Sequence, residues 1–98
     1  TGGINVAPVE VEEILLAHPG VHLAFVTGVP DPTRDEALAA AVVLKQGAVV
    51  SEADLLAHCR EALAAYKIPR LVRFVTESAL PLTTTGKVQK NLLRERLR

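Results

Sequence analysis

Apolar residues recur at helical spacing in three segments of the chain. The first segment starts at Pro8, whose fixed φ suits the first turn of a helix, and it ends at Pro19-Gly20. In the second, Ser51 and Asp54 form a capping-box pattern at the start, and Pro69 closes the segment. The third is a basic stretch near the end of the chain. Each segment predicts an amphipathic helix, with these apolar positions: Val11, Ile14 and Leu15; Leu55, Leu56, Cys59, Leu63 and Tyr66; Leu92, Leu93 and Leu97.

Three shorter runs have the composition of strands. Residues 21–27 and 71–75 are rich in β-branched and aromatic residues, and Pro30-Asp31-Pro32 predicts a turn after the first run. Residues 37–44 are ambiguous, because alanine favours a helix whereas Val42-Val43-Leu44 before a glycine favours a buried strand. We predict a strand here and leave a helical start open.

The predicted order is helix, strand, strand, helix, strand, helix. The economical packing of these elements is an α+β fold, in which helices flank a small three-stranded sheet. A chain of 98 residues is long enough for one small domain, so we expect a single domain that spans residues 1–98.

Composition narrows the functional classes. The 11 basic residues balance the 11 acidic ones, which argues against nucleic acid as a partner. Cys59 is the only cysteine, so no internal disulfide forms and a reducing, cytoplasmic location is expected. No apolar run is long enough for a transmembrane segment. The chain contains no methionine, and we therefore expect it to be a fragment of a longer protein.

The candidate chemistry lies in a loop of sequence PLTTTGK at residues 81–87. Pro81 fixes one backbone angle, three threonines disfavour a helix, and Gly86 frees the backbone, which predicts an adjustable arm with Lys87 at its tip. A cation presented in this way suits an anionic ligand. The loop is no P-loop, because Pro81 and Val88 stand where that motif needs a glycine and a hydroxyl residue. The alternative is a linker whose lysine heads the last helix and points into water.

Other polar residues suggest no site of their own. His18, His22 and His58 have no metal-ligand spacing with Cys59, so no metal site is expected in this chain. Glu12 and Glu13 are interpreted as solvated charges in the first turns of a helix rather than as a catalytic pair.

Four segments of the chain together resemble the C-terminal domain of the acyl-CoA synthetases, which belong to the adenylate-forming superfamily. They are GGINVAPVEVEE at 2–13, PDP at 30–32, YKIP at 66–69 and PLTTTGK at 81–87. The resemblance covers essentially the whole chain, with the motifs in the same order. It departs from the family at Asp35-Glu36, where Gly-Glu is common, and the hinge residue expected before Gly2 is missing.

The resemblance implies a two-step ligase. A carboxylic acid, with a fatty acid as the expected class, reacts with ATP to give an acyl-adenylate, and coenzyme A then takes the acyl group. A large N-terminal adenylation domain would hold most of the ATP and acid sites together with magnesium. This chain would be its mobile C-terminal lid, inactive in isolation. Lys87 would be the catalytic lysine that reaches the acid and the α-phosphate during adenylation.

The resemblance also implies a coenzyme A site. Gly2, Gly3 and Ile4 would line the channel for the pantetheine arm. Arg34 and the run Ile68-Pro69-Arg70 would lie near the phosphates of coenzyme A, where a guanidinium group can donate hydrogen bonds to two phosphate oxygens at once. The alternative for the glycines is an ordinary tight turn, and for the arginines solvated loop charges.

Two other functions remain open at this stage. One is an adenylation domain that loads a carrier protein, of the peptide-synthetase or fatty-acyl-AMP ligase type. The motifs around Gly2-Gly3-Ile4 and Gly86-Lys87-Val88 resemble the CoA-ligase versions more closely. The other is a module without catalytic activity that binds nucleotides or a partner protein. The length of the parent gene upstream of this chain distinguishes an excised enzyme domain from such a module.

Overall fold

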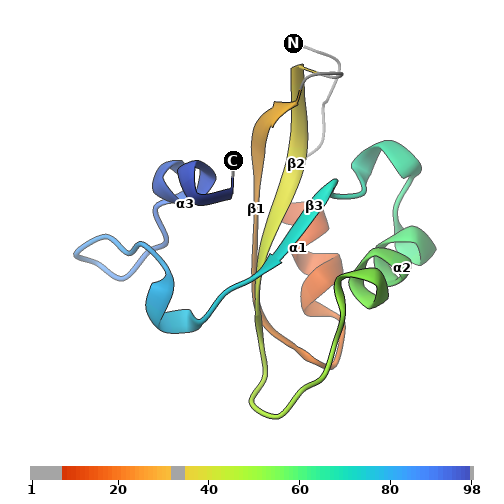
Figure 1. The fold of residues 1–98 in the computed structure, drawn as a ribbon, viewed down its shortest axis with the longest axis horizontal. Helices are drawn as coiled ribbons and strands as arrows, with labels where there is room; N and C mark the ends of the chain where they lie inside the picture. Colours follow the sequence, from red (N-terminus) through yellow and green to blue (C-terminus); the bar gives the residue numbers. More distant parts are fainter. Residues whose placement is uncertain (1–7, 32–34, 98) are drawn as a thin grey trace.

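The computed structural model describes residues 8–31 and 35–97 of the chain (Figure 1). It confirms the predicted α+β fold. The elements, in chain order, are α1 (Pro8–Leu16), β1 (Val21–Asp31), β2 (Asp35–Leu44), α2 (Glu52–Ala62), the 3-10 turn η1 (Ala65–Lys67), β3 (Leu71–Phe74), the 3-10 turn η2 (Glu77–Ala79) and α3 (Lys90–Leu97).

The sheet has the order β1-β2-β3, so β2 lies in the centre. β1 and β2 are antiparallel, with Val26 opposite Ala40, whereas β2 and β3 are parallel, with Ala40 opposite Val72. The parallel pairing needs a crossover, and α2 supplies it between β2 and β3.

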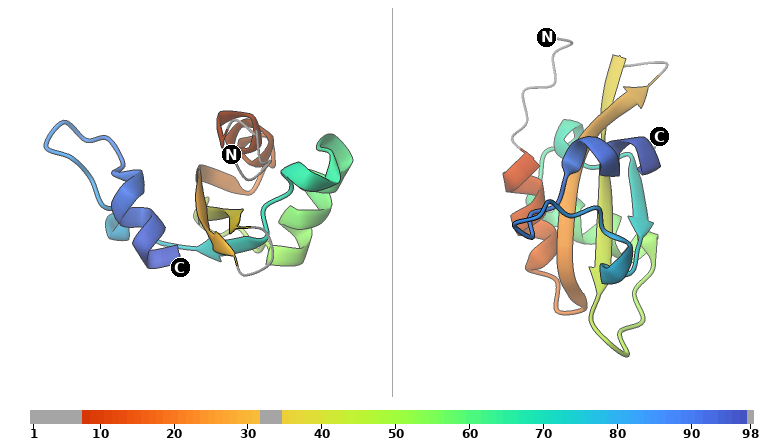
Figure 2. Two further views of the ribbon diagram at one scale, coloured as in Figure 1. Left: turned by 90° about the horizontal axis from the view of Figure 1, so that it is seen from above. Right: turned by 90° about the vertical axis from the view of Figure 1, so that its left-hand side faces the viewer.

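Two hydrophobic clusters cover the two faces of β2. Leu38, Ala40 and Val42 pack in a cluster with residues of α1 and α2, while Ala39 and Ala41 belong to a cluster with Leu93 and Leu97 of α3. The views in Figure 2 show α2 and α3 on opposite sides of the sheet. Because residues 37–43 are all buried, the segment behaves as a central strand, and its helical start does not form.

The structure extends β1 beyond its predicted end. Pro30 and Asp31 continue the strand, opposite Glu36 and Asp35, so the turn predicted at Pro30-Asp31-Pro32 is wrong for its first two residues. Pro32 lies outside the described residues. An edge strand accepts proline because one of its sides needs no ladder hydrogen bond.

The second helix has the predicted start and an earlier end. Ser51 and Asp54 form the capping box, which confirms that prediction. The helix stops at Ala62, because Leu63 is already in an extended conformation, with φ of −124° and ψ of 148°. Ile68 before Pro69 is extended too, as a residue before proline prefers. The stretch predicted as the last turns of the helix is therefore a short 3-10 turn.

Candidate functional site

The segment from Pro81 to Gln89 is a closed hairpin. Leu82 and Val88 form an antiparallel bridge, and the Thr83 N–H donates to the Lys87 carbonyl at 2.7 Å. The Lys87 N–H donates to Thr83 Oγ1 at 3.1 Å. Gly86 has a φ of 87°, which glycine adopts without a steric cost. The adjustable arm expected from the sequence is thus a hydrogen-bonded turn, with Lys87 just after its tip instead of at it.

The base of this hairpin is fixed where α3 begins. The Gln89 N–H donates to the Pro81 carbonyl at 2.7 Å, and its side-chain Nε2 donates to the Leu82 carbonyl at 3.1 Å. The side chain of Lys87 is exposed. It lines a hollow of about 540 Å³, whose walls also include Glu12, Phe25 and Lys90. The hairpin therefore presents an ammonium group to solvent from an ordered backbone.

Glu12 lines the hollow beside Lys87 and is paired there, so its interpretation as a solvated helix charge is wrong. Its side chain is only 15% exposed and its Oε2 lies 2.6 Å from Lys90 Nζ. The same oxygen accepts the backbone N–H of Val26 in β1 at 2.8 Å. Glu13, its neighbour, is exposed, as expected for a charge in the first turns of a helix. Sequence reasoning missed Glu12 because its partners are far away along the chain.

A second group of candidate residues lies around the end of η1. Ile68 is half-buried, Pro69 is buried and Arg70 is exposed, and all three line a shallow hollow of about 330 Å³ together with Arg60. Nearby, Lys67 Nζ lies 2.8 Å from Glu10 Oε1 of α1. Arg60 was not identified from the sequence, because it reads as an ordinary basic residue in the last turn of a helix.

The structure does not bring the two groups together. Ile68 packs against the cluster on the α1 and α2 face of the sheet. The Lys87 hollow instead includes Leu23 and Phe25, which pack against the cluster on the α3 face. The remaining candidates, Gly2, Gly3, Ile4 and Arg34, lie outside the described residues.

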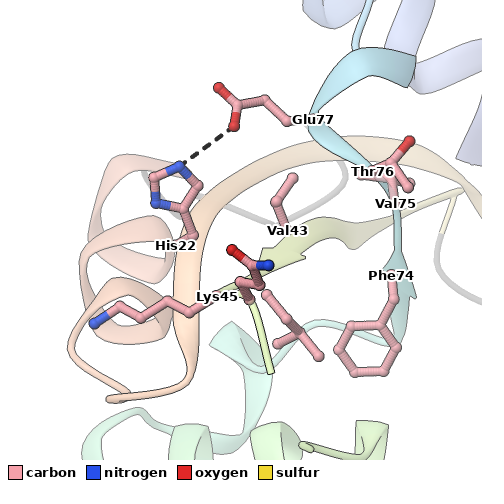
Figure 3. A pocket seen from close by; sticks show the side chains of 9 residues that line it. His22, Val43, Lys45, Phe74, Val75, Thr76 and Glu77 are labelled. Carbon is pink, nitrogen blue, oxygen red and sulfur yellow. Dashed lines mark ion pairs between the residues drawn. The ribbon is translucent and has the colours of Figure 1, made fainter. Parts of the chain in front are cut away.

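A further hollow, of about 690 Å³, lies beside β3 (Figure 3). Phe74 is 41% exposed there. Across the hollow, His22 Nε2 lies 3.4 Å from Glu77 Oε1, a pair drawn as a dashed line in Figure 3. No motif in the sequence pointed to these residues. Glu77 also lines the Lys87 hollow, so the two hollows adjoin.

The other histidines and the cysteine have structural roles. His18 Nδ1 accepts the Gly20 N–H at 3.0 Å after the end of α1, and His58 Nε2 lies 2.6 Å from the Ile14 carbonyl, to which it donates. Burial raises the pKa of the Cys59 thiol, which keeps it protonated. Across residues 8–31 and 35–97 there is no cluster of three or more His, Cys, Asp or Glu side chains that could hold a metal ion. None of the helices in that part of the chain is long and apolar enough to cross a membrane.

Comparison with known proteins shows which protein family the chain matches. The family described as "AMP-binding enzyme C-terminal domain" matches residues 10–87. A CoA ligase from Rhodococcus jostii, named for a methyl-dioxo-octahydroindenyl-propanoyl group, is 48% identical over 95 residues, which are 97% of this chain and 18% of that protein. The sulfoacetate–CoA ligase of Cupriavidus necator is 46% identical over 89 residues, or 91% of this chain and 17% of that ligase.

A solved structure has the same fold. The crystal structure of ATP-bound MatB from Rhodopseudomonas palustris superimposes with a TM-score of 0.91 at 45% identity, covering 98% of this chain and 19% of that protein. The chain therefore spans less than a fifth of the length of each of these three proteins.

Proposed function

Because the chain belongs to the AMP-binding enzyme C-terminal domain family, we propose that it is the C-terminal part of an acyl-CoA ligase. In this enzyme a carboxylic acid reacts with ATP to form an acyl-adenylate and pyrophosphate, and the thiol of coenzyme A then displaces AMP. The ligases that align with nearly all of this chain support the reaction type. These relatives are named for chemically different acids, so the acid is a separate question.

The observation that carries the proposal is the placement of Lys87. Its backbone is held by hydrogen bonds within the hairpin while its side chain is exposed beside a hollow. Attack of a carboxylate on the α-phosphate gathers negative charge, and a cation placed there lowers the barrier. An ordered backbone limits the reorganisation needed to deliver that cation. We assign Lys87 to the adenylation step on this basis.

Coenzyme A would use other residues of the chain. Arg70 and Arg60 border the same shallow hollow, in which Ile68 and Pro69 supply apolar surface. Two guanidinium groups suit the phosphates of coenzyme A. We retain Gly2, Gly3, Ile4 and Arg34 as further candidates on the strength of the sequence motifs alone.

The two groups of residues imply two orientations of the domain. The hollow beside Lys87 is bordered by Phe25, which packs on the α3 face of the sheet, whereas Ile68 packs on the opposite face. A single fixed orientation would present only one face to a common active site. We therefore propose that this domain, with residues 1–98 as its extent, is a mobile lid on a larger N-terminal domain. That domain would supply the acid pocket, most of the ATP site and the magnesium.

Three finer points belong to the same proposal. A fatty acid is our expected substrate class. A cytoplasmic location is supported by the single cysteine, whose thiol is buried. The acyl acceptor is coenzyme A, since the relatives reported above are CoA ligases. A carrier protein as acceptor is the competing hypothesis, and offering both acceptors to the acyl-adenylate form of the enzyme would distinguish them.

The first test replaces Lys87 with alanine in the full-length enzyme that contains this chain. Pyrophosphate release with a panel of acids should fall on the order of 100-fold. Formation of acyl-CoA from supplied acyl-adenylate should be retained, because that step does not use the lysine. The matched control is Lys45→Ala, which removes an exposed lysine beside the β3 hollow. Unchanged pyrophosphate release in Lys87→Ala would refute the assignment.

A further inference from the structure

We propose that Glu12 is a positioning residue for Lys87, acting through Lys90 at the start of α3. The proposal rests on the function assigned to Lys87 above. In this arrangement the carboxylate ties the base of the hairpin to the edge of the sheet. Glu12 would touch neither substrate nor phosphate.

One carboxylate oxygen joins three elements. Glu12 Oε2 belongs to α1, accepts the Val26 N–H of β1 at 2.8 Å and lies 2.6 Å from Lys90 Nζ of α3. The Glu12 side chain is 15% exposed and that of Lys90 is 40% exposed. Partial burial strengthens an ion pair relative to one in open water, and the bond to a rigid strand fixes where the carboxylate lies.

The tie reaches Lys87 through a short stretch of backbone. Lys90 directly follows Gln89, whose N–H and side-chain amide close the hairpin on Pro81 and Leu82. The position of Lys90 therefore sets the position of the hairpin base, and the internal hydrogen bonds transmit it to Lys87. Glu12, Lys87 and Lys90 also line one hollow, so the tie lies beside the cation that it orients.

The first experiment measures the order of the hairpin itself. Hydrogen exchange of the full-length enzyme is compared for wild type, Glu12→Gln and the control Glu13→Gln, which changes an exposed charge on the same helix. Glutamine keeps an oxygen for the Val26 N–H and loses the attraction to Lys90. We expect faster exchange in residues 81–90 of Glu12→Gln only, with residues 52–62 of α2 unchanged. Equal exchange in all three proteins would overturn the proposal.

The second experiment separates positioning from general stability. In Glu12→Gln and in Lys90→Gln, adenylation should fall about 10- to 100-fold, the range expected for a misplaced catalytic group. Thioester formation from supplied acyl-adenylate should stay at the wild-type rate in both variants. Lys90→Arg, which keeps the positive charge, should adenylate at close to the wild-type rate. The double variant Glu12→Gln with Lys90→Gln should lose no more than either single one.

The outcomes separate this proposal from the function on which it rests. If Lys87→Ala abolishes adenylation while Glu12→Gln matches Glu13→Gln in rate, the positioning role is wrong and the catalytic lysine stands. If Glu12→Gln loosens the hairpin while Lys87→Ala adenylates normally, the catalytic assignment is wrong. Equal loss of both half-reactions in Glu12→Gln would indicate a structural role and would also overturn the proposal.

Discussion

Replacing Leu93 with alanine tests how strongly α3 depends on its contact with the sheet. Leu93 is 2% exposed and packs with Ala39 and Ala41 of β2. The substitution removes three carbon atoms, which at about 0.8 kcal/mol each amounts to about 2.4 kcal/mol of burial. A residual cavity adds to this, so buried leucines typically cost about 2.7–5 kcal/mol. We expect about 3 kcal/mol, because α3 lies in an outer layer and can relax.

The neighbouring Leu92 provides the matched control, because it lies on the same helix and is 44% exposed. Leu92→Ala should cost less than about 1 kcal/mol, in line with its remaining contact with solvent. Urea unfolding of the 98-residue chain, followed by far-UV circular dichroism because the chain lacks tryptophan, measures both variants. With a urea slope of about 1–3 kcal/mol per molar, Leu93→Ala should lower the midpoint by about 1–3 M.

A difference of less than about 0.5 kcal/mol between Leu93→Ala and Leu92→Ala would refute this reasoning, since surface substitutions usually stay within that range. It would mean that packing of α3 on the sheet contributes little to stability. That outcome would be unexpected, because a helix of eight residues is only marginally stable without packing. The placement of the hairpin before α3 would then need another explanation.

Three further predictions concern α2. Ser51→Ala should lower the unfolding free energy by about 1 kcal/mol through loss of the N-cap, measured by urea unfolding; an unchanged midpoint would contradict this. Hydrogen bonds with the Ser51 backbone and side chain lower the pKa of Asp54 from its ordinary value of 3.8. The contribution of the Asp54 carboxylate to the free energy of unfolding is therefore complete above pH 3.8 and is lost as the pH falls through the lower pKa of the folded state. A pH series of the same measurement on Asp54→Ala should therefore converge with wild type in acid. The buried Cys59, whose pKa is raised, should react with iodoacetamide only as the chain unfolds, and rapid labelling of the folded protein would exclude this.

The elements that the sequence predicted well are those with one clear local signal. The capping box of α2 and the β-branched run at the start of β1 depend on neighbouring residues, which the sequence shows directly. The alanines of β2 have helical propensity, and only burial on both faces makes them a strand. That burial could be inferred from the valines that follow but not from the alanines themselves.

The parts that could not be predicted depend on contacts between distant residues. Pro30 continues β1 because its pairing with β2 outweighs its local preference for a turn. Glu12 looked like a solvated helix charge, since nothing near it in sequence announces Val26 or Lys90 as a partner. The motif at 81–87 indicated the candidate lysine, yet the hairpin that holds it depends on threonine and glutamine hydrogen bonds across the turn.

The hydrogen bond between Glu12 and Val26 also affects how readily β1 could pair with a strand of another copy of this chain. β1 is an eleven-residue strand at the edge of the sheet, and long edge strands are templates for intermolecular strand pairing. Because the Glu12 carboxylate accepts the Val26 N–H, that donor is not available to another strand. A second chain that paired with β1 at Val26 would have to displace the carboxylate. Glu12, which we propose orients the hairpin, would thus also block intermolecular pairing along β1. Among variants of this chain, Glu12→Ala should therefore be the first to aggregate.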